Sequence, residues 1–113
     1  MVKVHFWVDP ESKSINMKLK GHANTAPKGQ DLVCASATML VYTVAQAISF
    51  MNEQGYLAEK PKIKIREGKA SVSAIPKEEY YAEVLHTFWV AQCGAHLLSV
   101  NYPEAVSLNH LTV

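Results

Sequence analysis

Hydrophobic and polar residues alternate along two stretches near the N-terminus, and this pattern predicts two β-strands. Within 2–8, valine and phenylalanine occupy every second position, and Lys3, His5 and Trp7 stand between them. The stretch 15–20 alternates in the same way. A period of two places successive side chains on opposite faces of a strand, so each strand is expected to bury one face. The short, turn-rich segment between them favours an antiparallel hairpin.

Two longer apolar stretches predict helices. The first should run from Asp31 to about Asn52, with one apolar face at helical spacing that packs on the sheet. The second should run from about Lys77 to about Asn101 and is apolar most of the way round. Such a helix is expected to be buried on two sides, and in so short a chain the second side would meet a partner subunit. The apolar face of the first helix comprises Val33, Ala37, Leu40, Val44, Ile48 and Met51.

The remaining stretches complete a single α+β domain. The runs 62–66 and 70–74 alternate around Glu67-Gly68, which predicts a second hairpin. The tail 105–113 has the spacing of a fifth strand. The element order ββαββαβ predicts a two-layer sandwich over residues 1–113, with a mostly antiparallel sheet and two helices packed on it.

Composition narrows the class of protein and of partner. The chain has 113 residues, 49% hydrophobic and 19% charged, which is typical of one folded domain. A formal net charge of +1 does not indicate a protein that binds polyanions through its overall charge, so direct nucleic-acid binding is not expected. A small local basic patch would still be compatible with this net charge. The two cysteines lie in predicted helices, so we expect a reducing cytoplasm rather than a disulfide framework. The N-terminus lacks signal-peptide architecture.

A membrane span is the alternative reading of the first helix. Residues 32–51 contain no charged side chain and are numerous enough to cross a bilayer. The run is nevertheless polar for a lone span and ordinary for a helix buried in protein, so no membrane is expected. Its polar residues are Ser36, Thr38, Tyr42, Thr43, Gln46 and Ser49.

The candidate chemistry lies in residues 21–38, which read GHANTAPKGQDLVCASAT. His22 stands in a loop with no periodicity, and Cys34 stands in the first turn of the helix that Asp31 begins and would cap. A helix N-terminus and a neighbouring imidazolium each lower a thiol pKa, from ~8.5 into the range ~3.5–7.5. The unbonded N–H groups of the same turn can hold an oxyanion. Asp31 could cap the helix, orient His22, or do both.

Other readings of these residues stay open. A cysteine in an apolar helix is most often a small core residue, and a loop histidine is often a surface residue. A redox sensor would need Cys93 to reach Cys34. A zinc site from His86, Cys93 and His96 on the second helix is conceivable, but no tight CxxC pair supports it, so we expect neither metal nor cofactor. A module that binds a peptide without cutting it is the alternative outside enzymes.

The residues of this stretch resemble a known signature. Gly21-His22-Ala23, then Gly29, then Asp31-Leu32-Val33-Cys34-Ala35 resembles that of the bacterial ribosomal-processing cysteine proteases, the Prp family. Tyr102-Pro103 followed by a strand is similar to the family's ending, and the resemblance covers nearly the whole chain. It implies a small α/β homodimer in the cytoplasm. It also implies an endopeptidase that removes the N-terminal extension of large-subunit ribosomal protein twenty-seven during ribosome assembly.

The resemblance also implies a role for each matching residue. Cys34 would be the nucleophile, His22 the general base and Asp31 the supporting acid. Gly21 and Gly29 would let the loop that carries His22 move.

One position departs from the family's pattern. The family often has serine where this chain has Thr38, one helical turn after Cys34. The hydroxyl is retained, so the chemistry should be intact, while the extra methyl could alter a substrate subsite. We expect Ala35 and Thr38 to contact the substrate.

Overall fold

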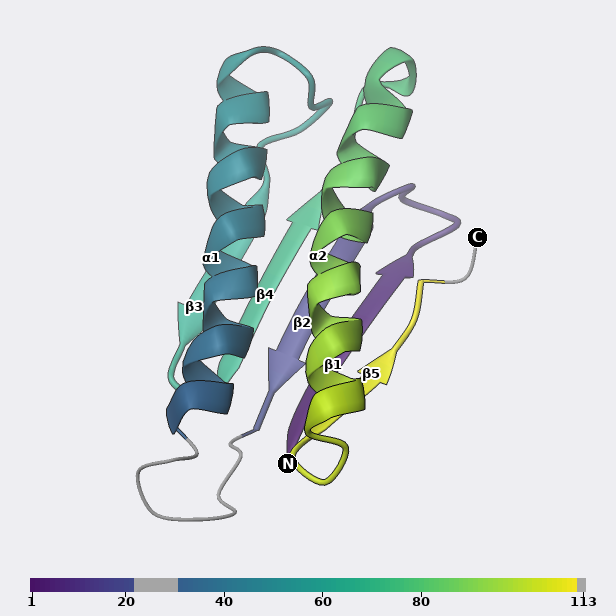
Figure 1. Cartoon of the computed structure of the whole chain (residues 1–113). Helices are drawn as coiled ribbons and strands as arrows, with labels where there is room; N and C mark the ends of the chain where they lie inside the picture. The colour runs from purple at the N-terminus through teal and green to yellow at the C-terminus, as the bar shows by residue number, and fades with distance from the viewer. Residues whose placement is uncertain (22–30, 112–113) are drawn as a thin grey trace.

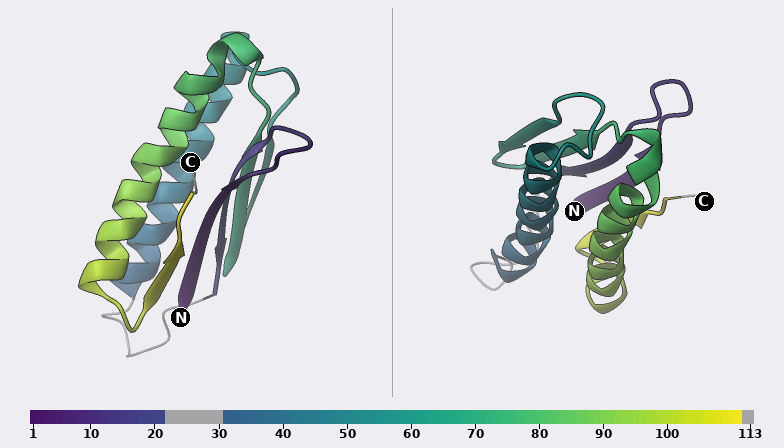
Figure 2. Two further views of the ribbon diagram at one scale, coloured as in Figure 1. Left: turned by 90° about the vertical axis from the view of Figure 1, so that its right-hand side faces the viewer. Right: turned by 90° about the horizontal axis from the view of Figure 1, so that it is seen from above.

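A five-stranded sheet and two helices on one of its faces form two layers (Figures 1 and 2). The computed structural model describes residues 1–21 and 31–111, apart from the side chain of Asp31. The predicted order ββαββαβ is confirmed, and a short 3-10 helix precedes the second helix. The elements are β1 (Val2–Val8), β2 (Ile15–Lys20), α1 (Asp31–Glu53), β3 (Lys62–Arg66), β4 (Lys69–Ala74), η1 (Glu78–Tyr80), α2 (Tyr81–Asn101) and β5 (Val106–Asn109).

The sheet is mostly antiparallel, as predicted, with one parallel pair at its edge. The strand order is β3-β4-β2-β1-β5. The pairs β1–β2, β2–β4 and β3–β4 are antiparallel, whereas β5 runs parallel to β1. In Figure 1, α2 returns the chain to the end of the sheet at which β1 begins, so β5 must run in the same direction as β1.

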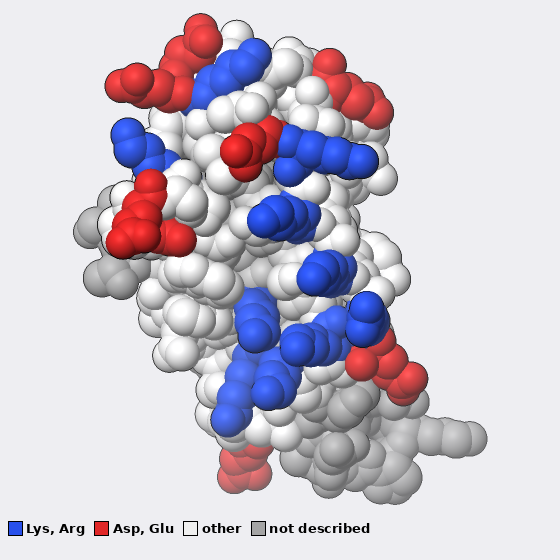
Figure 3. All heavy atoms as spheres, turned by 180° about the vertical axis from the view of Figure 1, so that it is seen from behind, with Lys and Arg blue, Asp and Glu red and all other residues white. Residues whose placement is uncertain are grey.

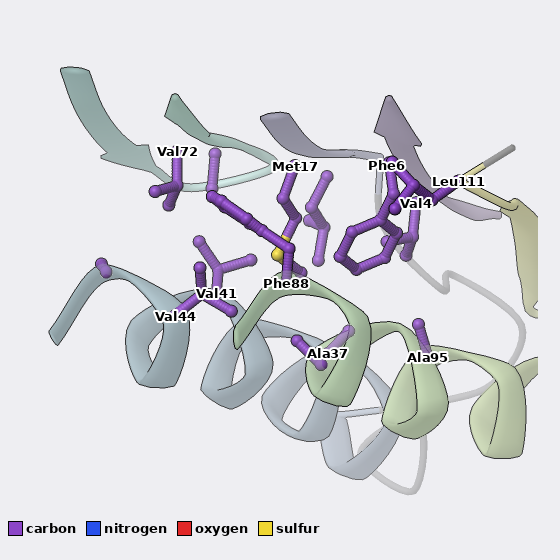
Figure 4. Close-up of a cluster of buried hydrophobic side chains, with 14 of the residues drawn as sticks. Val4, Phe6, Met17, Ala37, Val41, Val44, Val72, Phe88, Ala95 and Leu111 are labelled. Carbon is purple, nitrogen blue, oxygen red and sulfur yellow. The ribbon is translucent and has the colours of Figure 1, made fainter. Parts of the chain in front are cut away.

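The core lies between the two layers. Each strand contributes its inward face, and the helices contribute the side chains that point toward the sheet, with Phe88 of α2 and Met17 of β2 fully buried (Figure 4). Fully burying one such side chain stabilises a fold by about 1.5–3 kcal/mol. A buried hydrogen bond, from the backbone N–H of Leu111 to Oε1 of Gln92 at 2.5 Å, ties the segment after β5 to α2.

Helix α1 buries more than the predicted face. Val33, Ala37, Val44 and Ile48 of that face are buried, whereas Leu40 and Met51 are only partly buried. Val41, outside the predicted face, is fully buried. The cause is that α1 meets both the sheet and α2, so its buried stripe is wider than a single-surface pattern allows.

Helix α2 is buried on one side only within this chain. Its buried residues are Val84, Phe88, Ala91, Gln92 and Ala95. On the other side, Val90, Leu97 and Val100 expose 62%, 61% and 61% of their surfaces. The predicted second contact therefore remains a prediction, because this side faces outward.

Residues Leu32–Glu53 are long and apolar enough to cross a membrane by length and composition. In this fold the same helix supplies part of the core, since its inward side chains pack against the sheet. A core helix passes the same test of length and hydropathy, so the composition of α1 alone does not define a span.

Candidate active site

Cys34 lies in the first turn of α1, as the sequence predicted. Its neighbours Val33 and Ala37 point into the core, while Ala35 is exposed. Cys34 itself is half-buried and packs against the core cluster. The thiol is thus held at the margin between core and solvent, where packing fixes the side chain without enclosing it.

The end of the helix supplies electrostatics suited to a thiolate. The first backbone N–H groups of an α-helix have no acceptor within the helix, and the aligned peptide dipoles place partial positive charge there. Both effects favour an anion next to the first turn, whether it is a thiolate or the oxyanion of a tetrahedral intermediate. Cys34 occupies that turn by its position in the chain.

Gly21 anchors the chain where it leaves β2. Its φ angle is +102°, a left-handed conformation that glycine adopts without strain. Its N–H donates to the carbonyl oxygen of Gly68 at 2.9 Å, in the turn between β3 and β4. A Cβ atom at Gly21 would collide with the carbonyl oxygen of Met1. Conformation and space therefore both favour glycine at this position, and the role of Gly21 as a hinge stays a prediction.

Several predicted site residues lie outside the described residues. His22 and Gly29 belong to residues 22–30, and only the backbone assignment of Asp31, as the first residue of α1, is described. The distance between His22 and Cys34, and the capping role of Asp31, stay predictions.

The expected substrate-contacting positions differ in exposure. Ala35 is exposed, and Thr38 is half-buried one turn after Cys34. Residues four apart lie on the same side of a helix, so Thr38 neighbours the thiol position.

A groove that the sequence did not predict lies along the contact between the two helices. It has a volume of about 440 Å³ and runs past Ser36 and Leu40 of α1 and Leu97 of α2. A Cβ at Gly94 would come within 2.7 Å of Cδ2 of Leu40, so this glycine lets the helices approach closely. Positions 34 and 36 differ by about 200° around a helix, which places the groove across α1 from the thiol. The sequence feature that indicates this close packing is Gly94, a glycine within an otherwise apolar helix.

The described residues give no support to the redox or metal readings. Cys34 and Cys93 are not joined by a disulfide, and Cys93 is exposed on α2. In residues 1–21 and 31–111, no group of three or more His, Cys, Asp or Glu side chains could hold a metal ion.

Comparison with known proteins shows which protein family the chain belongs to. A family model described as cysteine protease Prp matches residues 1–107. The chain is therefore a cysteine protease, with a thiol at the start of its core helix. It belongs to the Prp family, as the signature around Cys34 implied.

Solved structures share the fold over almost the whole chain. One is the ribosomal processing protease Prp from S. aureus in complex with a covalently linked product peptide; it has a TM-score of 0.71 and 22% identity, covering 99% of this chain and 100% of that one. The same S. aureus protease with a substrate peptide has a TM-score of 0.67 and 20% identity, with coverage of 99% and 100%. SMU.848 from Streptococcus mutans has a TM-score of 0.69 and 19% identity, with coverage of 99% and 96%. No significant match was found among curated proteins.

Proposed function

We propose that this protein is an endopeptidase that removes the N-terminal extension of large-subunit ribosomal protein twenty-seven in the cytoplasm during ribosome assembly. The observation that supports it best is the position of Cys34 in the first turn of α1, within a chain that matches the Prp family from residue 1 to 107. The S. aureus relative is a ribosomal processing protease crystallised with substrate and product peptides.

The proposed catalytic pair is Cys34 and His22. The Cys34 thiolate attacks the scissile carbonyl carbon, and the carbonyl oxygen becomes an oxyanion next to the N–H groups of the first helical turn. His22 donates a proton to the leaving amine as the peptide bond breaks, which leaves a thioester on Cys34. Water then attacks the thioester with His22 as general base, releasing the acid product and the thiol.

Three further residues have supporting roles in this proposal. Asp31 orients the imidazole of His22 and so acts as a positioning residue. Ala35, exposed, and Thr38, half-buried, contact the bound peptide near the thiol. The reaction needs no metal or cofactor, because thiol, imidazole and helix N–H groups supply nucleophile, acid–base and oxyanion site.

The test is cleavage of a peptide that spans the junction between extension and mature protein. We expect Cys34→Ala to abolish cleavage and His22→Ala to reduce kcat by roughly 10²–10⁴-fold, the usual contribution of a positioned acid–base group. Asp31→Asn should lower kcat less than His22→Ala and shift the pH profile. Cys93→Ala and His96→Ala are matched controls, because both side chains are exposed on α2, and both should cleave normally.

The outcomes separate the alternatives. Cleavage that survives Cys34→Ala would exclude a thiol protease, and normal cleavage by His22→Ala would exclude the pair. A wild-type protein that binds the peptide without cutting it, under conditions where the S. aureus protease cuts, would favour a non-enzymatic ribosome-associated peptide-binding module.

We also propose that the protein is a homodimer that pairs through the outer side of its helical layer. Helix α1 exposes Leu32, Met39, Tyr42 and Phe50, with relative exposures of 51–66%. The adjacent helix exposes an apolar stripe of its own at Val90, Leu97 and Val100. Exposed apolar side chains on two neighbouring helices are typical of protein interfaces, and a second copy would give α2 the second contact that its pattern predicts.

A further inference from the structure

The face of the sheet opposite the helices carries most of the cations of the chain. The five strands contain no Asp or Glu. Seven of the 11 Lys and Arg residues stand at strand positions that point away from the core, and Figure 3 shows their concentration on this face. They are Lys3, Lys18, Lys20, Lys62, Lys64, Arg66 and Lys69.

Four of these cations form a continuous row across four strands. Lys3 stands opposite Lys20, Lys20 opposite Lys69, and Lys69 opposite Arg66. Neighbouring strands are about 4.8 Å apart, and like charges directly opposite one another destabilise a sheet. Among the described residues no ion pair neutralises the row. A row of like charges that forms no ion pair within the described part of the chain is suited to an anionic partner.

Two aromatic rings lie on the same face. The rings of His5 and Trp7 are 4.6 Å apart between centroids, with an angle of 31° between their planes. Trp7 also lines a shallow hollow of about 390 Å³ that reaches across the sheet to Lys62 and Lys64. Rings on an open sheet offer stacking surfaces for unpaired bases.

Small polar side chains fill the positions between the cations. Ser71 stands between Lys18 and Lys64, and Ser73 stands between Asn16 and Lys62. The half-buried hydroxyl groups of Ser71 and Ser73 can form hydrogen bonds to the 2′-hydroxyl groups and base edges of RNA.

We propose that this outer sheet face binds single-stranded RNA. The cations contact phosphates, and the His5–Trp7 pair stacks on bases. An acidic peptide would use the charges but not the paired rings. The expectation that nucleic acid is not a partner rested on the net charge of +1, which averages over this face and the acidic residues elsewhere. The proposal does not depend on peptide cleavage.

The first test measures binding of a labelled, unstructured RNA to the full chain by fluorescence anisotropy, between about 50 and 200 mM salt. Each lost phosphate contact on a single strand makes the negative slope of log K against log salt shallower by about 0.7, so Lys20→Ala/Lys69→Ala should make it shallower by about 1.4. The affinity at low salt should fall about tenfold. The control is Lys60→Ala/Lys77→Ala, which removes the same charge from exposed positions outside the strands and should bind like wild type.

The second test separates RNA from other anions. Trp89→Phe leaves Trp7 as the only tryptophan, because the chain has two. RNA should then quench Trp7 fluorescence, whereas polyglutamate and vesicles of anionic lipid should bind more weakly and leave the emission unchanged. Thermal unfolding of each variant checks that it is folded. Absence of RNA binding, equal loss in both lysine pairs, or polyglutamate binding as tight as RNA would overturn the proposal.

Discussion

Gly21 combines two constraints at the scale of a single residue. Its φ of +102° disfavours any side chain, and a Cβ there would meet the carbonyl oxygen of Met1. We expect Gly21→Ala to lower the free energy of unfolding by about 2–3 kcal/mol, through backbone strain and displacement of the β1 start. Urea unfolding followed by circular dichroism measures this.

The matched control is Gly55→Ala. Gly55 has a φ of +80°, but a Cβ there would meet only the side-chain nitrogen of Lys77, at 3.7 Å. This variant should lose about 1 kcal/mol from the unfavourable φ alone. Equal losses in the two variants would show that the contact with Met1 carries no energy.

The position of Cys34 could be predicted from sequence because it depends on local pattern. An apolar periodicity that starts at Asp31 puts residue 34 in the first turn, and its neighbours Val33 and Ala37 indicate which side is buried. The approach of His22 to the thiol depends on the path of a loop with no periodicity. Local rules do not fix that path, so the pattern indicates His22 and Cys34 as candidates, and the signature implies their roles as base and nucleophile.

At the scale of elements, the outer sides of α1 and α2 are the surface that a homodimer would bury. A single charge placed in a dry interface costs several kcal/mol when it has no partner. If the proposed dimer forms through this surface, Met39→Glu and Leu97→Glu should each give a monomer, measured by size-exclusion chromatography with light scattering. Both side chains are more than half exposed, so neither change disturbs the core.

The control for these two variants places the same charge outside the proposed interface. Ala58→Glu adds the same charge at an exposed position outside both helices and should leave the dimer intact. A wild-type chain that stays monomeric at high concentration would contradict the dimer. Binding of that monomer to neutral lipid vesicles would assign the apolar side to a membrane instead.

Strands were predicted more completely than the packing of elements. A period of two determines which face of β1 or β2 is buried, whichever strands pair with it. The burial of Val41 depends on α1 meeting α2 as well as the sheet, and the parallel direction of β5 depends on where α2 ends. These are properties of the assembled layers, which a one-dimensional pattern does not contain.

At the scale of the whole molecule, the two faces differ in chemistry. Helix α1 carries no charged residue between Leu32 and Asn52, whereas the exposed side of the strands carries cations and no carboxylate. The net charge of the chain is close to zero because it sums the charges of both faces. Only the strand register, which the sequence did not give between β2 and β4, aligns Lys20 with Lys69.

The cation row should reduce stability in a way that salt reverses. Lys20 stands between Lys3 and Lys69, so Lys20→Thr relieves two like-charge pairs and should raise the free energy of unfolding by about 0.5–1 kcal/mol at low ionic strength. Lys62→Thr is the matched control, because the same substitution is made on a strand where the opposite residue is Ser73. At about 1 M salt the Debye length falls to about 3 Å, so the advantage of Lys20→Thr over Lys62→Thr should disappear. Thermal and urea unfolding at the two salt concentrations measure this difference. If Lys20→Thr remains more stable than Lys62→Thr in high salt, the gain comes from strand propensity rather than from charge. In that case the cation row does not destabilise the fold, and an anionic partner would relieve no repulsion by binding to it.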